Sequence, residues 1–173
     1  MAISLYDATV GRFLQGLQGL GGVLEKGRAH AAEIGLDLEE LAGASLWPDM
    51  RPLSYQVVAA KYHSLGAVEG VMRGAFSPPP NDPHTYAEIE ELAAETHEAL
   101  LRIEPDAVDA LADRPVIFKG RRDLPFTGAG FLLSFSVPNF YFHAATAYDL
   151  LRMKGVPLSK RDFLGPLRLA ETS

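Results

Sequence analysis

The fold is decided by residues 52–73, PLSYQVVAAKYHSLGAVEGVMR, whose apolar residues recur at the spacing of one long helix. This helix is expected to begin at Pro52 or Leu53, because proline suits a first helical turn, and to end at Arg73. Bulky apolar side chains occupy one face, and small residues together with His63 occupy the opposite face. Because a helix that is apolar on two faces is buried on both, we expect it at the centre of a bundle.

The chain before this segment predicts a first long helix from Leu5 to about Lys26, which Ser4 can cap. A shorter helix is expected over Arg28–Ile34, ending at Gly35. Several glycines interrupt the first helix, and each costs about 1 kcal/mol relative to alanine but allows another helix to approach closely. These glycines are Gly16, Gly19, Gly21 and Gly22.

Two more long helices are expected after residue 80. The third runs from Thr85 to Ile103 and ends before Pro105; Thr85 and Glu88 have the spacing of a capping box. The fourth runs from about Gly128 to Lys154, and Pro138 inside it should kink it. Shorter helices are expected at 38–41, after an Asp37 cap, and at 160–164.

The only strand-like part of the chain lies at residues 114–126, where two short apolar runs flank a polar turn. We therefore predict a small β-hairpin between the third and fourth helices. Since 173 residues suit one domain, the sequence as a whole predicts an all-α four-helix bundle that forms a single domain over residues 1–173.

Composition excludes several classes of function. With 16 Lys and Arg against 22 Asp and Glu, the net charge is −6, which argues against binding of a nucleic-acid backbone. The absence of cysteine excludes disulfides, iron–sulfur clusters, thiolate zinc sites and a cysteine nucleophile. No stretch approaches the roughly 20 apolar residues of a membrane helix, and the segment that begins at Met1 lacks a basic leader, so we expect a cytoplasmic protein.

The histidines are the main candidates for chemistry. No two of the five have the His-x-x-x-His spacing that places two metal ligands on one helical face; they are His30, His63, His84, His97 and His143. His63, His97 and His143 lie on apolar faces and are expected to point inward. Each is either a core histidine with one hydrogen bond or a ligand in a site assembled across helices.

Residues 138–143, PNFYFH, are the most unusual segment. Pro138 withdraws a backbone donor and frees a carbonyl near residue 134, and such breaks often line cavities. Asn139 either forms a hydrogen bond with the freed backbone carbonyl or lines a pocket together with His143, which lies one turn further along the helix. On the second interpretation, the pocket is lined by His63, His97, Asn139, Tyr141, His143 and Tyr148.

Four segments together resemble a bacterial domain-of-unknown-function family that is grouped with the DinB/YfiT-like metalloenzymes. They are residues 46–53 (LWPDMRPL), 138–143 (PNFYFH), 147–152 (AYDLLR) and 155–165 (GVPLSKRDFLG). The resemblance implies a four-helix bundle with a crossover topology, often as a homodimer. In the wider superfamily three histidines hold a divalent metal such as Zn, Ni or Mn, and members act as thiol S-transferases or hydrolases.

Carried onto this sequence, the resemblance places His63 and His143 at two of the metal positions. The third position, four residues after His143, is Ala147, which cannot ligate, and one turn earlier stands Asn139. We therefore expect an incomplete metal site and a pocket near His143 that binds a small molecule. Two alternative functions are a divalent-metal enzyme, with His97 or Asp49 as the third ligand, and a purely structural dimer. The sequence does not assign roles to Asp49 and Met50.

Overall fold

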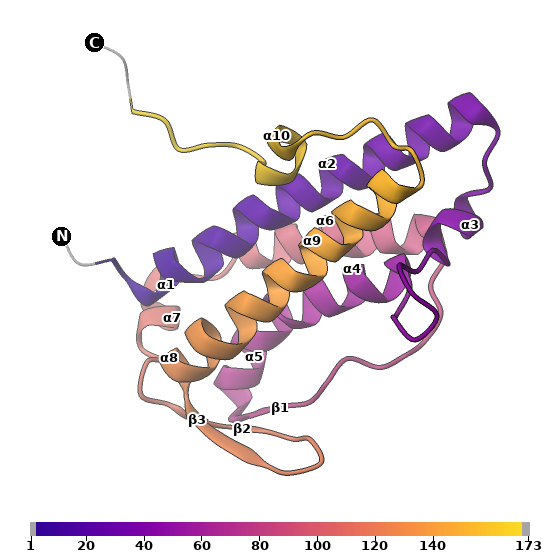
Figure 1. Ribbon diagram of the computed structural model, residues 1–173. Coiled ribbons are helices and arrows are strands. Elements are labelled where there is room, and N and C mark those ends of the chain that lie inside the picture. Colours follow the sequence, from indigo (N-terminus) through magenta and orange to yellow (C-terminus); the bar gives the residue numbers. More distant parts are fainter. Residues whose placement is uncertain (1–2, 171–173) are drawn as a thin grey trace.

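The structure is a computed structural model that describes residues 3–170. Met1 and Ala2, where the prediction about a leader segment begins, lie outside the described residues. Four long helical segments lie side by side, and a small three-stranded sheet lies at one end of them (Figure 1). The fold is thus mostly helical. The predicted hairpin is present as part of that sheet.

The N-terminal segment contains two helices, α1 (Leu5–Ala8) and α2 (Val10–Ile34). The Ser4 side chain caps α1 by accepting from the Asp7 N–H, as predicted. The predicted end near Lys26 and the separate helix from Arg28 are wrong, because α2 runs through both positions. Gly27 does not break α2, since it is buried against Tyr86 and Leu151. Gly35 ends α2 in the left-handed conformation with φ of 70°.

The segment expected as one central helix is divided into α4 (Leu53–Tyr62) and α5 (Leu65–Arg73), after the short α3 (Leu38–Ala42) that Asp37 caps. The break falls at His63 and Ser64. There the Ser64 hydroxyl donates to the carbonyl of Ala60 at 2.7 Å, in competition with the helical backbone pattern. The single helix predicted over this segment is therefore wrong in its middle.

The third helix, α6 (Tyr86–Leu101), begins at the predicted capping box of Thr85 and Glu88, which is present in both directions. One face of α6 is exposed and the opposite face is buried, as expected for an amphipathic helix. The exposed face carries Glu88, Glu91, Glu95 and Glu98. Pro105 ends this region by starting a further short helix, α7 (Pro105–Asp109).

The sheet has the order β1-β2-β3. Strands β2 (Pro115–Phe118) and β3 (Leu124–Thr127) form the predicted antiparallel hairpin. Strand β1 (Ala75–Phe76) pairs in parallel with β2 and was not predicted, because two residues after a helix end carry no strand pattern of their own.

The fourth long segment is not uniform. It consists of α8 (Gly128–Phe131), the π-helical turn η1 (Leu132–Ser136) and α9 (Val137–Met153), and Pro138 lies in the first turn of α9. The Asn139 side chain donates to the Phe135 carbonyl at 2.7 Å. Thus the irregularity expected at Pro138 takes the form of a π turn just before it. After Gly155, the predicted short helix is α10 (Lys160–Leu164).

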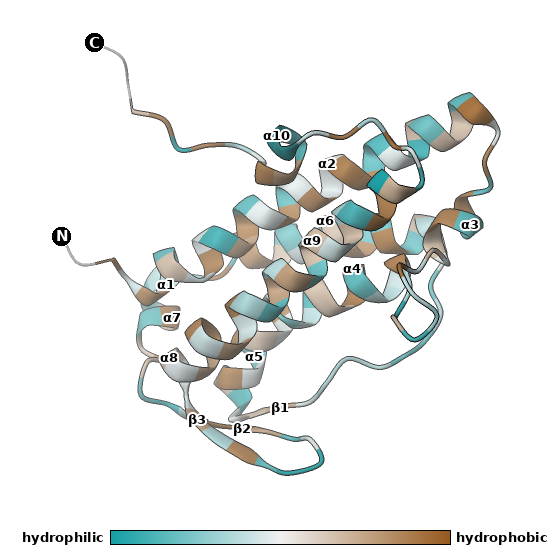
Figure 2. Ribbon diagram, viewed as in Figure 1, coloured by the Kyte–Doolittle hydropathy of each residue, from teal (hydrophilic) through white to brown (hydrophobic). Residues whose placement is uncertain are grey.

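One buried apolar cluster joins these elements. Helix α2 packs against α6 and α9, and α4 packs against the same two helices. Along each long helix, hydrophobic residues alternate with hydrophilic ones (Figure 2). This pattern is typical of amphipathic helices, which bury one face and expose the other. Among the described residues, no helix is both long and apolar enough to cross a lipid bilayer.

Candidate functional site

His63 owes its position to the break between α4 and α5. It is the residue at which α4 ends, with φ of −84° and ψ of 5°, and only 5% of it is exposed. Its ring packs between the rings of Phe76 and Phe135, with centroids 5.5 Å away in each case. At the break, the His63 side chain packs against aromatic rings contributed by β1 and η1.

His143 comes from α9 and lies against His63. The two imidazole rings are nearly parallel, at an interplanar angle of 13°, and their centroids are 5.6 Å apart. Two further rings pack against His143: Tyr55 of α4, with centroids 6.1 Å apart, and Phe142, the residue before His143 on α9, with centroids 5.2 Å apart. The two histidines predicted to be functional therefore form one pair between α4 and α9, which we call the His63–His143 pair.

Gln56 fixes the tautomer of His143. The Gln56 amide donates from Nε2 to the Arg51 carbonyl at 2.9 Å, so its Oε1 faces His143 Nδ1 at 2.7 Å. Since Oε1 can only accept, His143 Nδ1 must carry a hydrogen. In the neutral ring, the Nε2 atom of His143 then has a free lone pair.

Both rings are neutral at pH 7. Burial lowers the pKa of His63 to about 4, and the neighbouring His143 lowers it further in the same direction. Burial likewise lowers the pKa of His143 to about 4. A second positive charge beside the first, away from water, would be unfavourable, so the pair resists protonation well below the ordinary histidine range.

Two polar atoms near this region are unsatisfied. Within residues 3–170, the buried His63 Nδ1 and the buried Ser136 Oγ of η1 have no hydrogen-bond partner. Buried polar groups are nearly always paired, so each exception asks for an explanation such as a functional role or an unseen partner. π turns are themselves frequent at functional sites.

The other residues predicted to line the pocket lie elsewhere or are engaged. His97 lines a hollow between α2 and α6 with glycine and glutamate residues. Asn139 is held by the Phe135 carbonyl, Tyr141 packs on the Phe140 ring, and Tyr148 packs on the Phe163 ring of α10. The structure therefore brings together His63 and His143 but does not gather all six residues around one cavity.

The turn before α4 does not reach the His63–His143 pair. Asp49 is exposed, and Met50 donates its backbone N–H to the Trp47 carbonyl within that turn. Neither residue contributes a side chain to the pair in the contacts described. Asp49 thus stands in the turn and not in the position of a third ligand.

The three-histidine ion implied by the resemblance does not fit these residues. Ala147 is fully buried and offers no ligand atom, and Asn139, whose Nδ2 donates to the Phe135 carbonyl, carries an amide in place of the imidazole or carboxylate that zinc prefers. Within residues 3–170, no three His, Cys, Asp or Glu side chains converge. Two imidazoles supply only half of the four ligands that a structural zinc prefers, and one fewer than a catalytic zinc takes from its protein.

Three residues of this site were not predicted from the sequence: Gln56, Phe76 and Phe135. The residue type of Gln56 gives no signal, because glutamine is ordinary in a helix. Phe76 is delivered by the unpredicted strand β1, and Phe135 by the π turn. The helical spacing between Gln56 and His63, two turns apart on α4, was the available clue to Gln56.

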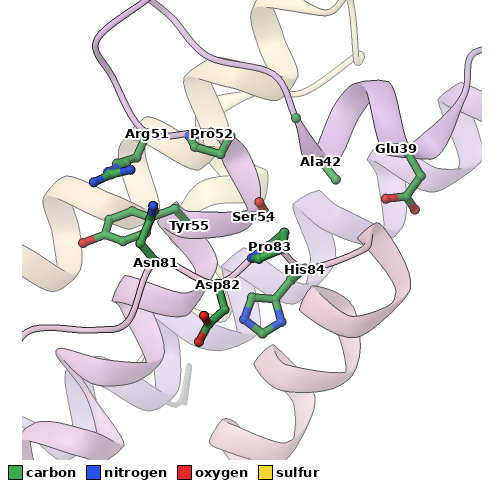
Figure 3. Close-up of a pocket in the computed structure, with 11 residues that line it drawn as sticks. Glu39, Ala42, Arg51, Pro52, Ser54, Tyr55, Asn81, Asp82, Pro83 and His84 are labelled. Carbon is green, nitrogen blue, oxygen red and sulfur yellow. The ribbon is translucent and has the colours of Figure 1, made fainter.

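A hollow separate from the pair lies where α3, the start of α4 and the proline-rich loop meet (Figure 3). It has a volume of about 380 Å³. Tyr55 borders both sites, since its ring lines the hollow and packs on His143.

Comparison with known proteins supports this architecture. A sequence profile described as "Domain of unknown function (DUF1993)" matches residues 5–164. A crystal structure of a DinB family member protein from Shewanella denitrificans is 28% identical to this chain, with a TM-score of 0.83. The match covers 97% of this chain and 96% of that one. A search of curated proteins finds no match.

Proposed function

Since this chain belongs to the DUF1993 family and shares the fold of a DinB family protein, we propose that it binds a small neutral molecule at the His63–His143 pair. The observation that carries the proposal is the buried His63 Nδ1 atom, which has no partner among the described residues. A ligand that hydrogen-bonds to this edge of the pair would satisfy it.

The surroundings favour a ligand of particular chemistry. Both imidazoles are neutral at pH 7, so an anion would find no positive charge on them. The rings of Phe76 and Phe135 offer apolar contact on His63, and the ring of Phe142, which is 58% exposed, packs on His143. The ligand therefore combines an uncharged hydroxyl or amide with an apolar or aromatic body.

We also propose that the helices carrying this site form a four-helix bundle with a crossover topology. Its support is the pattern of neighbours: α2 and α4 each pack against α6 and α9, which are the later two of the four long segments. Consecutive long helices therefore need not be nearest neighbours, as a crossover requires.

The proposal is tested with benzyl alcohol as the probe and with benzoate and benzylamine as its charged counterparts. Two-dimensional NMR of labelled protein at pH 7 should show saturable shifts around His63 and His143 with benzyl alcohol. The charged probes should bind at least about tenfold more weakly, because no opposite charge compensates their desolvation.

A matched pair of variants gives the control. His143→Ala should abolish the shifts, whereas His84→Ala, a change in a histidine away from the pair, should leave them intact. Equal binding of benzyl alcohol to wild type and to His143→Ala, in a variant whose spectrum shows a folded protein, would contradict the proposal. So would shifts confined to residues outside the pair.

A further inference from the structure

The hollow beside α3 and the start of α4 carries charges of both signs. Arg51 and Asn81 come together with Tyr55 at one end, Asp82 and His84 point the same way from the loop, and Glu39 stands at the far side (Figure 3). Its volume of about 380 Å³ falls in the range of small-ligand pockets.

The amino end of α4 opens onto this hollow without a side-chain cap. Its N-cap residue is Pro52, which has no capping group, and the Leu53 N–H is used by the Ala44 carbonyl. The backbone N–H groups of Ser54 and Tyr55 have no protein partner in the described part of the chain. Free N–H groups and the helix dipole together attract an anionic group.

Ser54 provides a second, independent indication of a ligand. It lines the hollow, only 6% of it is exposed, and its hydroxyl makes no hydrogen bond to residues 3–170. Figure 3 shows this hydroxyl between Tyr55, Pro83 and Ala42, at the middle of the lining. A hydroxyl that no protein group uses can donate to, or accept from, a molecule in the hollow.

The positive end of the hollow is completed by Arg51. Its guanidinium lies over the Tyr55 ring, 5.6 Å from the centroid, and forms no ion pair within the described residues. Arg51, the amino end of α4 and Ser54 thus offer a charged group, two N–H donors and a hydroxyl to one carboxylate.

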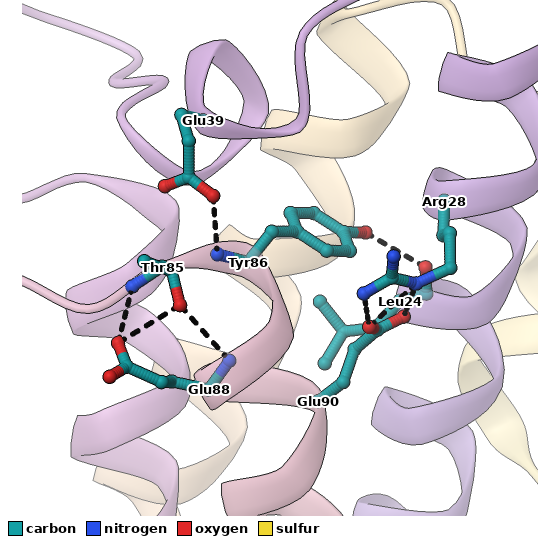
Figure 4. A network of polar contacts seen from close by, with 7 residues as sticks. All are labelled: Leu24, Arg28, Glu39, Thr85, Tyr86, Glu88 and Glu90. Carbon is teal, nitrogen blue, oxygen red and sulfur yellow. Dashed lines mark hydrogen bonds and ion pairs between the residues drawn. The ribbon is translucent and has the colours of Figure 1, made fainter.

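Two carboxylates line the hollow, Asp82 from the loop and Glu39 from the far side (Figure 3). Glu39 accepts the Tyr86 N–H at 3.3 Å through one oxygen, and that contact belongs to the network at the start of α6 (Figure 4). Asp82 has no ion-pair partner in the same part of the chain, and His84 lies 4.0 Å from Glu88. Asp82 is therefore the carboxylate free to meet a cation.

We propose that this hollow binds a small zwitterion of the amino-acid type, with its carboxylate at Arg51 and the amino end of α4 and its ammonium at Asp82. A simple anion would face two carboxylates, and a simple amine would leave Arg51 and the N–H groups of α4 without a partner. A molecule with both charges satisfies both ends at once. This site is independent of the His63–His143 pair, although Tyr55 borders both.

The test is an NMR titration of the full chain with three zwitterions and two singly charged analogues. The zwitterions are alanine, β-alanine and 4-aminobutyrate, which differ in the separation of their charges; the analogues are propionate and propylamine. We expect at least one zwitterion to shift the amide signals of Ser54 and Tyr55 saturably. Propionate and propylamine should bind about tenfold more weakly or worse, since each loses one charge-assisted contact.

Variants separate the two ends of the hollow. Arg51→Ala and Asp82→Asn should each weaken binding by about tenfold or more, and Arg121→Ala, in the exposed turn of the hairpin, should not change it. Both altered side chains are exposed, so the variants should fold, and the dispersion of their spectra verifies this. The proposal is overturned if no zwitterion shifts these amides, if propionate binds as well as the zwitterions, or if Arg51→Ala binds like wild type. Because benzyl alcohol reports on His143, this outcome is separate from that of the first proposal.

Discussion

At the residue scale, the hydrogen-bond chain from His143 through Gln56 to the Arg51 carbonyl sets the chemistry of the pair. A backbone carbonyl can only accept, so Gln56 must present its oxygen to His143, and His143 must donate from Nδ1. The sequence could suggest that both histidines point inward, but it could not supply this chain. The reason is that the orientation of an amide depends on partners from a distant segment.

Acidification should destabilise the protein through these two rings. Unfolded histidines take up protons below their ordinary pKa of 6.5, whereas the folded rings resist until about pH 4. The unfolded state therefore binds more protons between these values, and stability present above pH 6.5 is lost as pH falls towards 4. His63→Leu should reduce this loss by on the order of 2 kcal/mol, as measured by urea denaturation across that range.

The control for this pH series is His84→Leu, whose side chain lies outside the pair. This variant keeps the pair, so it should keep the loss of stability between pH 6.5 and 4 that the pair causes. Parallel profiles for wild type and His63→Leu would show that the pair does not carry the loss.

Asn139 is expected to act as a structural residue. Its amide satisfies the Phe135 carbonyl at 2.7 Å beside the π turn, so Asn139→Ala should lower the free energy of unfolding by about 1 kcal/mol. Asp149→Ala, at an exposed position of the same helix, should have a smaller effect in the same chemical denaturation experiment. A gain of stability in Asn139→Ala would instead mark a strained, functional residue.

At the element scale, the sequence predicted helix ends that are capped by nearby side chains, but it did not predict breaks inside a helix. The capping box of Thr85 and Glu88 lies within four residues and was predicted correctly. The break at His63 and Ser64 was not, because both residues are acceptable inside a helix and the Ser64 hydroxyl can bond backward in an intact one. The sequence therefore predicted the four segments better than the places where they bend, and the site lies at those bends.

The glycines of α2 divide into two kinds that the sequence does not distinguish. A Cβ atom on Gly19 would lie 2.4 Å from the Phe163 carbonyl oxygen of α10, whereas a Cβ on Gly22 would have no neighbour within 4 Å. Gly19→Ala should therefore destabilise the protein by displacing α10. Gly22→Ala should stabilise it by up to about 1 kcal/mol through helix propensity alone.

Thermal unfolding of the two glycine variants gives the comparison directly. We expect the Tm of Gly19→Ala to fall and that of Gly22→Ala to rise relative to wild type. An equal rise in both would mean that α10 does not rest on α2 as described.

At the scale of the whole molecule, the four helical segments share one apolar core, and their fold is that of a DinB family protein. The mostly helical class and the hairpin followed from periodicity and turn chemistry. The third strand and the pairing of α4 with α9 depend on contacts between distant segments, which no local pattern encodes. The rings around His63 come from these same contacts, because Phe76 lies on the third strand and His143 lies on α9.

The oligomeric state is a prediction that belongs to this scale. The resemblance implies a homodimer, and large apolar side chains such as Trp47 and Phe142 are exposed. Sedimentation velocity at micromolar concentration should give a species of twice the 18.8 kDa chain mass. A single species at the chain mass across that concentration range would contradict the expectation.

The site consists of two neutral imidazoles that meet without a third ligand, and ¹⁵N NMR of the histidine side chains tests this arrangement directly. The measurement uses protein without a histidine tag at pH 7, before and after one equivalent of Zn²⁺. We predict that both rings of the His63–His143 pair are neutral, that His143 carries its proton on Nδ1, and that zinc leaves both spectra unchanged. A protonated ring, a His143 proton on Nε2, or joint saturation of both rings by one equivalent of zinc would contradict it.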